Sequence, residues 1–162
     1  MLIRPATRGD VPSILEIYNQ VVQTTFAIYD ERPSTLAERD SWFQARVSAG
    51  WPVLVAESAG EVAGFSSFGE WRSRWGYRFT VEHSVHVRAD QRRQGIGRAL
   101  VEALFPLAVA AGKHTMIAHI DSLADASVRL HARLGFQTVG TFHEVGHKDR
   151  WLSVIAMQRM LT

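Results

Sequence analysis

The chain has 162 residues, a length that suits one domain with a single hydrophobic core. Its formal net charge is only +2 at pH 7 and its basic residues never form a long run, so the composition does not indicate a nucleic-acid-binding protein. The absence of cysteine excludes disulfides and thiol chemistry by this chain. Without an export signal or an apolar stretch of about 18 residues, we expect one cytoplasmic domain over residues 1–162 and no membrane partner.

Hydrophobic periodicity along the chain alternates between the patterns of strands and helices. Two helix starts carry N-terminal caps, Thr7 with Asp10 and Thr35 with Glu38. In chain order we expect a strand at 2–4, helices at 7–21 and 35–49, strands at 53–57, 62–68 and 79–88, a helix that residues 92–97 open and that ends near 112, a strand at 115–120, a helix at 126–134, and strands at 136–142 and 151–160. This order predicts an α/β fold, a single domain with a mixed central β-sheet flanked by helices on both faces.

A basic turn that contains glycine stands between the strand at 79–88 and the next helix. Its sequence is Arg92-Arg93-Gln94-Gly95-Ile96-Gly97-Arg98. The first turn of a helix offers unpaired backbone N–H groups and the positive end of the helix dipole, and glycine lets an anion approach the backbone closely. Because arginines surround it, this turn predicts a site for a cofactor that carries a diphosphate.

Two nucleotide-binding motifs are alternatives for this turn. Gly95 and Gly97 also begin the G-x-G-x-x-G pattern of dinucleotide sites, and Asp121 could be the acid that such sites need about 20 residues further on. However, Leu100 occupies the third glycine position, and the motif lies far from the first strand of the domain. A P-loop is excluded, because no Gly-Lys-Ser or Gly-Lys-Thr occurs in the chain.

Two segments together resemble the general N-acetyltransferase (GNAT) superfamily, whose members transfer an acetyl group from acetyl-CoA. Arg92, Gly95 and Gly97 match its R-x-x-G-x-G motif, and residues 127–136 resemble its closing helix and Leu-Gly-Phe turn. Other segments resemble one branch, the phosphinothricin and methionine sulfoximine N-acetyltransferases; they are residues 71–74, 77, 80–82, 146–148 and 151. The resemblance spans nearly the whole chain. It implies a GNAT-like fold, acetyl-CoA as co-substrate, and a small amino acid analogue acetylated on its α-amine.

The resemblance also implies which residues hold the cofactor. The sheet of this family splays near Val87, where a free backbone N–H would contact the acetyl carbonyl and the pantetheine. The implied cofactor-binding residues are His86, Val87, Arg92, Arg93, Gln94, Gly95, Ile96, Gly97, Arg98 and Ser127. The family often has asparagine three residues before this serine, and the present chain has Ala124 instead. One contact to the pantetheine arm is therefore replaced or lost.

Two residues are implied for the chemistry of a direct transfer. Glu82 matches the general base of the branch, which would remove a proton from the acceptor ammonium, with a water as relay; alternatively, it pairs with a neighbouring cation. His131 stands where many members of the superfamily have tyrosine, so it could protonate the departing thiolate. It could also be a packing residue, because it lies on the apolar face of its helix.

The acceptor needs a binding site for its carboxylate. Arg72 and Arg74 are the candidates, because a pair of guanidinium groups on extended chain can bind a carboxylate bidentately; otherwise they are ordinary surface charges. Phe26 and Tyr77 could wall the pocket, and Lys148 belongs to the branch motif at its floor. The remaining histidines show no metal-binding spacing, so we expect no metal.

Branch relatives pair as dimers near residues 74–79, and the aromatic residues of this segment also favour a contact surface, so we expect a homodimer. Three other functions stay open. They are an acetyltransferase for a protein N-terminus or an amine antibiotic, a non-catalytic acyl-CoA-binding sensor that would not need Glu82, and a nicotinamide or flavin oxidoreductase.

Overall fold

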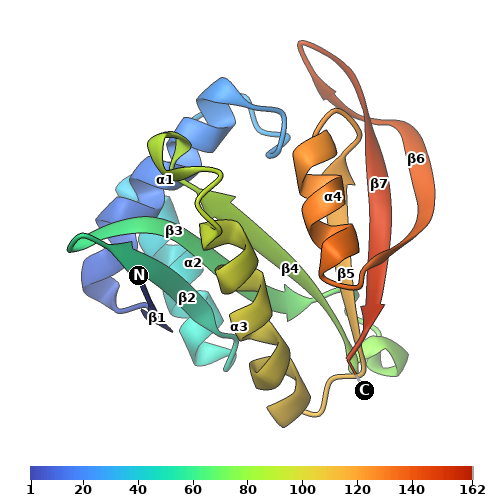
Figure 1. Cartoon of the computed structure of the whole chain (residues 1–162), viewed down its shortest axis with the longest axis horizontal. Coiled ribbons are helices and arrows are strands. Elements are labelled where there is room, and N and C mark those ends of the chain that lie inside the picture. The colour runs from blue at the N-terminus through green and yellow to red at the C-terminus, as the bar shows by residue number, and fades with distance from the viewer. Residues whose placement is uncertain (162) are drawn as a thin grey trace.

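A mixed sheet of seven strands, in the order β1-β2-β3-β4-β5-β7-β6, runs through the computed structural model (Figure 1). The structure describes residues 1–161. Its elements are β1 (Leu2–Pro5), α1 (Val11–Thr24), α2 (Leu36–Ser48), β2 (Val53–Ser58), β3 (Glu61–Glu70), β4 (Thr80–Val87), α3 (Ile96–Ala110), β5 (Thr115–Asp121), α4 (Asp125–Arg133), β6 (Gln137–Lys148) and β7 (Arg150–Met160). The expected order of strands and helices is confirmed.

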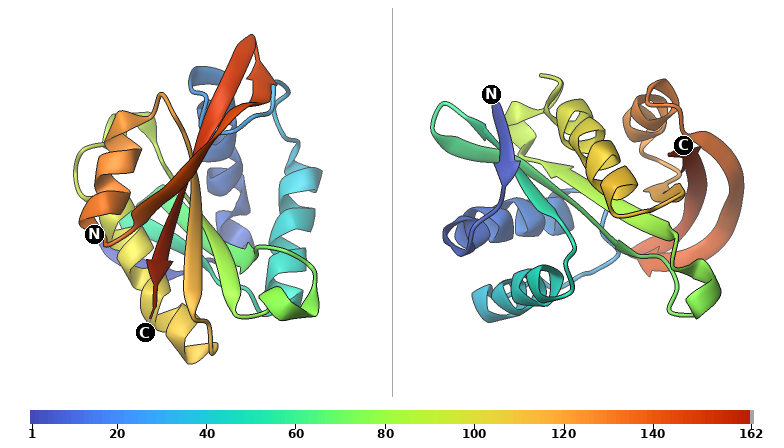
Figure 2. Two further views of the ribbon diagram at one scale, coloured as in Figure 1. Left: turned by 90° about the vertical axis from the view of Figure 1, so that its right-hand side faces the viewer. Right: turned by 90° about the horizontal axis from the view of Figure 1, so that it is seen from below.

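Helices cover both faces of the sheet, as expected. Helices α1 and α2 lie side by side on one face, and α3 and α4 lie on the other (Figure 2). Each face has its own hydrophobic cluster: α3 buries Leu100 and Leu104 against the sheet, and α1 buries Ile14 and Ile17. Full burial of one such side chain contributes about 1.5–3 kcal/mol. In the part of the chain that is described, no helix is long and apolar enough to cross a membrane.

The two caps act differently. Thr35 and Glu38 form the expected capping box of α2, with both hydrogen bonds at 3.2 Å. The carboxylate of Asp10 accepts a hydrogen bond from the N–H of Thr7, but this box precedes a short 3-10 helix over Arg8–Asp10, and α1 begins only at Val11. Arg4 binds the same carboxylate and holds the pKa of Asp10 below its usual value.

The closing hairpin is longer than expected. Strands β6 and β7 extend to a turn at Asp149, whereas the sequence pattern predicted that the first of them would end near residue 142. The register between the strands shifts twice, between Thr138 and Gly140 and between Phe142 and Gly146, and Glu144 has a positive φ of 53°. These irregularities break the alternation of side chains on which the prediction of a strand depends.

The sheet opens between its two central strands. Strand β4 pairs with its parallel neighbour β5 at only three positions, Thr80–Glu82 against Thr115–Ile117. Beyond Glu82, β4 continues beside β3 to Val87, whereas β5 continues beside β7 to Asp121. The two halves of the sheet therefore diverge, as Figure 1 shows, and leave a wedge of unpaired strand edge. This is the splay that the resemblance implied near Val87.

Candidate active site

The wedge between β4 and β5 is a continuous cleft made of two adjoining cavities of about 400 and 430 Å³. Volumes of this order suit small-molecule sites. The cavities share one set of lining residues, namely Ala27, Val85, His86, Asp121, Ala124 and Ser127. One cavity reaches Glu82 and the other reaches Arg92. The cleft thus connects the candidate base to the basic turn.

The basic turn has the geometry of an anion site. Gly95 is the N-cap of α3 with φ 79°, a left-handed conformation that favours glycine, and no side chain caps the helix there. The first N–H groups of α3 are thus left for a ligand or water. Arg92 lines the adjoining cavity and its Nε donates to the carbonyl of Val87 at 3.3 Å. The side chain of Ile96 is buried in the core, so only its backbone can contact a cofactor.

The other predicted members of the turn lie at the surface. Arg93, with φ 60°, and Gln94 are exposed, and Arg98 forms an ion pair with Glu102 at 2.9 Å. Ser127 lines both cavities on the opposite wall. The structure therefore brings Arg92 and Ser127 together across the cleft, and the exposed arginines contribute charge at its rim.

The backbone of β4 offers hydrogen-bond donors to the cleft. The N–H of Arg88 donates to the carbonyl of Ala63 on β3 at 2.8 Å. Because successive N–H groups of a strand point to opposite sides, the N–H of Val87 points away from β3 and into the wedge. This donor lies where the resemblance implied one for the acetyl carbonyl.

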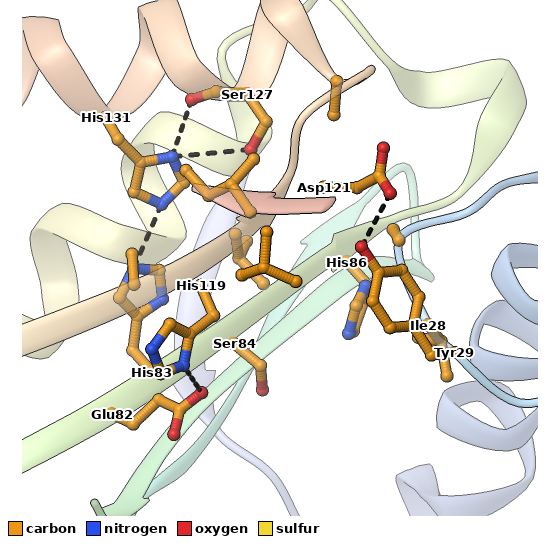
Figure 3. Close-up of a pocket in the computed structure, with 16 residues that line it drawn as sticks. Ile28, Tyr29, Glu82, His83, Ser84, His86, His119, Asp121, Ser127 and His131 are labelled. Atoms are coloured by element: carbon orange, nitrogen blue, oxygen red, sulfur yellow. Dashed lines mark hydrogen bonds and ion pairs between the residues drawn. The ribbon is translucent and has the colours of Figure 1, made fainter. Parts of the chain in front are cut away.

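Glu82 and His119 form a pair at the cleft end opposite Arg92. Oε1 of Glu82 lies 2.8 Å from Nδ1 of His119, and both side chains are about one-third exposed (Figure 3). Glu82 therefore has a partner, as the alternative interpretation of a charge pair required, while it still lines the cavity. His119 was not among the predicted site residues, although a histidine inside an otherwise apolar and buried strand was a usable signal.

His131 is fixed by its neighbours on both sides. It is 2% exposed, and its Nδ1 lies 2.7 Å from the carbonyl oxygen of Ser127. The carbonyl only accepts, so Nδ1 carries the hydrogen, and Nε2 must accept from Nε2 of His83 at 3.0 Å. The rings stack with centroids 5.0 Å apart. Both nitrogens of His131 are thus occupied within the protein, an arrangement that favours the packing alternative over proton donation.

Burial determines the charge of these histidines. It lowers the pKa of His83 to about 3, helped by repulsion from His131, and it also lowers the pKa of His131. Burial and two nearby arginines, Arg39 and Arg92, lower the pKa of His86 to about 4. The three imidazoles are therefore neutral at pH 7. His86 lines both cavities.

The loop after α1 closes one side of the cleft. Phe26 and Tyr29 are both in this loop; Phe26 lines the cavity near Arg92, and the Tyr29 hydroxyl donates to Oδ2 of Asp121 at 2.7 Å. Burial and this carboxylate raise the pKa of Tyr29. The loop is thereby tied to the end of β5. Phe26 lines the cavity that reaches Arg92 and not the one that reaches Glu82, so it lies away from the predicted acceptor pocket.

Lys148 forms hydrogen bonds with the backbone of this loop. Its side chain is buried, and its ammonium donates to the carbonyls of Thr25 at 3.0 Å and Ile28 at 3.2 Å, and also to that of Val22. An ammonium has three hydrogens to donate, so none remains for a ligand. The substrate contact predicted for Lys148 is replaced here by a structural role.

Arg72, Arg74 and Tyr77 lie outside both cavities. They belong to the exposed segment 71–79 that connects β3 to β4, and Arg72 stacks on Trp71 with its Cζ 4.6 Å from the ring centroid. Tyr77 also packs against Trp71, with ring centroids 5.2 Å apart. The segment enters β4 two residues before Glu82. The predicted carboxylate clamp is therefore near this end of the cleft, but it is not part of the cleft wall in one chain.

Comparison with known proteins settles the family. The Acetyltransferase (GNAT) family matches residues 14–136. The chain belongs to this family. It is 51% identical over 158 residues to the L-methionine sulfoximine/L-methionine sulfone acetyltransferase of Pseudomonas paraeruginosa, covering 96% of this chain and 92% of that one.

More distant relatives agree. The phosphinothricin N-acetyltransferase of Alcaligenes faecalis is 36% identical over 161 residues, covering 98% of this chain and 82% of its own. A solved acetyltransferase from Salmonella typhimurium with its cofactor acetyl-CoA has a TM-score of 0.97 at 45% identity, covering 100% of this chain and 94% of its own. This GNAT protein is thus an acetyltransferase. Its predicted resemblance to the methionine sulfoximine and phosphinothricin N-acetyltransferases is confirmed. Among residues 1–161 no group of three or more His, Asp or Glu side chains could hold a metal ion.

Replacing Lys148 by Met should destabilise this GNAT protein, because it leaves the three carbonyls of Val22, Thr25 and Ile28 without their donor. We expect a loss of about 1–3 kcal/mol in urea unfolding and faster amide exchange in residues 25–29. Lys113→Met is the matched control, because Lys113 donates to one carbonyl, that of Arg78, at the surface. Equal stability of the two variants would contradict the anchoring role of Lys148.

The buried pair His83 and His131 should make stability depend on pH. Their folded pKa values lie below that of unfolded histidine, so the unfolded chain binds more protons in acid. The free energy of unfolding should fall as pH drops from about 6.5, by up to about 1.4 kcal/mol per pH unit for His83, and His131 should add to this loss in the same direction. In the double variant His83→Phe/His131→Phe, the free energy of unfolding measured with urea should depend less steeply on pH between pH 7 and 4.5. The control variant His143→Gln, at an exposed position, should keep the wild-type dependence. An unchanged slope in the double variant would show that other groups cause the acid loss.

Proposed function

We propose that this protein transfers the acetyl group of acetyl-CoA to the α-amine of a small amino acid of the methionine sulfoximine, methionine sulfone or phosphinothricin type. One observation carries the proposal: a single cleft joins the uncapped start of α3 beside Arg92 to the carboxylate of Glu82. The named activities of the relatives support the choice of acceptor. Because the chain has no cysteine, the proposal is compatible with a cytoplasmic enzyme.

In this proposal the diphosphate of acetyl-CoA binds the first N–H groups of α3, with Arg92, Arg93 and Arg98 supplying charge. The pantetheine then runs through the cavity between His86 and Ser127, toward the N–H of Val87. This N–H stabilises the oxyanion that forms when the amine attacks the thioester. Ala124 lies in the wall of the same cavity, so the arm contacts backbone and a methyl group there.

The acceptor occupies the cavity at the Glu82 end. Its ammonium must lose a proton before it can attack, and we assign this step to Glu82 together with its hydrogen-bonded partner. Arg72 and Arg74 enter from the connection between β3 and β4 and bind the carboxylate of the acceptor. Tyr29 and Ile28 from the loop after α1 form the opposite wall of this cavity.

The test is a thiol-release assay with acetyl-CoA and a panel of acceptors. The panel holds methionine sulfoximine, methionine sulfone, phosphinothricin, the common amino acids and peptides with free N-termini. We expect turnover with the sulfoximine or sulfone that rises with pH and is lost in Glu82→Gln. If CoA binds but only peptides are acetylated, the N-terminal acetyltransferase is the correct function; if no acceptor is acetylated, an acyl-CoA sensor is favoured.

The same assay tests the carboxylate site. In Arg72→Ala/Arg74→Ala the KM for the amino acid should rise at least tenfold, because each lost guanidinium removes a charge-assisted hydrogen bond. The KM for acetyl-CoA should not change. The matched control is Arg32→Ala, because Arg32 is a surface arginine that pairs with Glu38. An unchanged KM in the double variant would place the carboxylate elsewhere.

We also propose that two copies associate through the segment 71–79. Trp75 is 76% exposed, and Tyr77 and Phe79 lie beside it, so a large aromatic surface faces solvent in one chain. Burial of this surface would order Arg72 and Arg74 beside the cleft. Light scattering after size-exclusion chromatography should give twice the chain mass at micromolar concentration, and Trp75→Ser should shift the protein toward monomer. A wild-type protein that stays monomeric would refute the dimer.

A further inference from the structure

The hydrogen bond between Glu82 and His119 crosses the sheet at the point where its backbone pairing stops. Glu82 and Ile117 are the last paired residues of β4 and β5, and His119 is the next residue of β5 on the same face as Ile117. The side chains of Glu82 and His119 therefore meet over the opening of the wedge, 2.8 Å apart, and both line the cavity (Figure 3). A pair at this place faces any acceptor that enters the cleft.

The chemistry of the two groups fixes the proton between them. A carboxylate oxygen can only accept, so Nδ1 of a neutral His119 carries the hydrogen and donates it to Glu82. Nε2 then has a free lone pair, and it makes no hydrogen bond within residues 1–161. A carboxylate on Nδ1 with a free Nε2 is the arrangement in which carboxylate–histidine pairs act as general bases.

We propose that Nε2 of His119 is the atom that takes the proton from the acceptor's ammonium, and that Glu82 orients the imidazole and stabilises it when it becomes charged. This inference rests on the proposed function and names the proton acceptor of the same site. It gives the carboxylate a different task from that of a lone base, and it assigns a role to a histidine that the sequence motifs did not single out.

The surroundings select His119 among the histidines of the cleft. Burial lowers the pKa of His83, His86 and His131, which makes each a weak base. His119 is instead about one-third exposed, and its ring lies edge-on to that of Phe142 of β6, with ring centroids 6.4 Å apart. The charged or titratable groups that face the pair are Tyr29, Arg46, His83, His86, Asp121 and His131. Burial lowers the pKa of Arg46, and the charge of Glu82 partly offsets this effect.

The step balances without another reactant. The ammonium gives one proton to Nε2, and the free amine attacks the thioester carbon, so that the C–N bond forms and the carbonyl becomes an oxyanion near Val87. As the oxyanion collapses, the C–S bond breaks and the nitrogen loses its second proton, which the thiolate takes up to give free CoA. His119 then returns its proton to solvent, to which its side chain is open.

The first test needs no acceptor. Nitrogen NMR of the histidine side chains at pH 8, assigned by comparison with His119→Gln, should show His119 with the hydrogen on Nδ1. In Glu82→Gln the amide oxygen can still accept, so the hydrogen should stay on Nδ1, whereas in Glu82→Leu no acceptor faces Nδ1 and this preference should be lost. A hydrogen on Nε2 in the wild type would overturn the proposal, whatever the substrate of the enzyme.

The second test separates a base from a positioning residue. In His119→Asn the amide NH2 can take the place of Nδ1 and still donate to Glu82, but nothing replaces the lone pair of Nε2. We expect kcat to fall by about 10²–10⁴-fold at pH 7, with KM for acetyl-CoA unchanged. The deficit should shrink toward alkaline pH, where free amine is already present. His143→Asn, on the exposed face of β6, is the matched control.

The two failures can be distinguished. If His119→Asn keeps wild-type kcat, His119 only positions Glu82 and the proposal is wrong, although the acetyltransferase function stands. If the wild type acetylates no amino acid on the panel, the proposed function fails, and the NMR result alone then decides whether Glu82 and His119 form a base with a free Nε2.

Discussion

The structure depends on the short pairing between β4 and β5. Three paired positions keep the two halves of the sheet together, and the strands separate after Glu82 and Ile117. A sheet that paired fully would have satisfied its backbone groups internally. Because it does not, N–H groups of β4 face an open wedge, and the same divergence leaves room between β4 and α4 for a ligand. The site is thus a gap in the backbone pairing between β4 and β5, and the rest of the fold keeps this gap open.

Side chains hold this wedge at a fixed width. The buried pair of His83 and His131 connects β4 to α4 across it, and Tyr29 connects the loop after α1 to Asp121 at the end of β5. Lys148, at the end of β6, binds the same loop through the carbonyls of Thr25 and Ile28, and it also binds the carbonyl of Val22 in α1. Each of these contacts joins segments far apart in the sequence, so they rigidify the cleft without closing it. Buried polar groups would destabilise the fold if they were unpaired, but here their hydrogen bonds connect the segments around the cleft.

The order of elements, the basic turn and the family were predictable because they depend on local pattern: hydrophobic period, helix caps, and glycine where α3 must start in a left-handed conformation at Gly95. The hydrogen-bond partners of Lys148 and His131 were not predictable, because they lie far away in the sequence. The partners of Lys148 are more than a hundred residues away, and His83 is 48 residues from His131. The length of β6 was also missed, since its irregular register hides the alternation that marks a strand. Local sequence pattern can therefore identify a candidate residue, whereas its role depends on contacts with residues far away in the sequence.

The same distinction explains why a carboxylate at Glu82 is an incomplete description of the base. The sequence motif that contains Glu82 describes β4 alone. The wedge is formed by β4 and β5 together, and β5 places the imidazole of His119 against the carboxylate of Glu82. Of the cleft histidines, those inside the protein are neutral and weakly basic because burial disfavours their charged form. His119 sits where the wedge opens to solvent, with its side chain about one-third exposed. The point at which the sheet splits therefore determines both where the acceptor can enter and which imidazole can receive its proton.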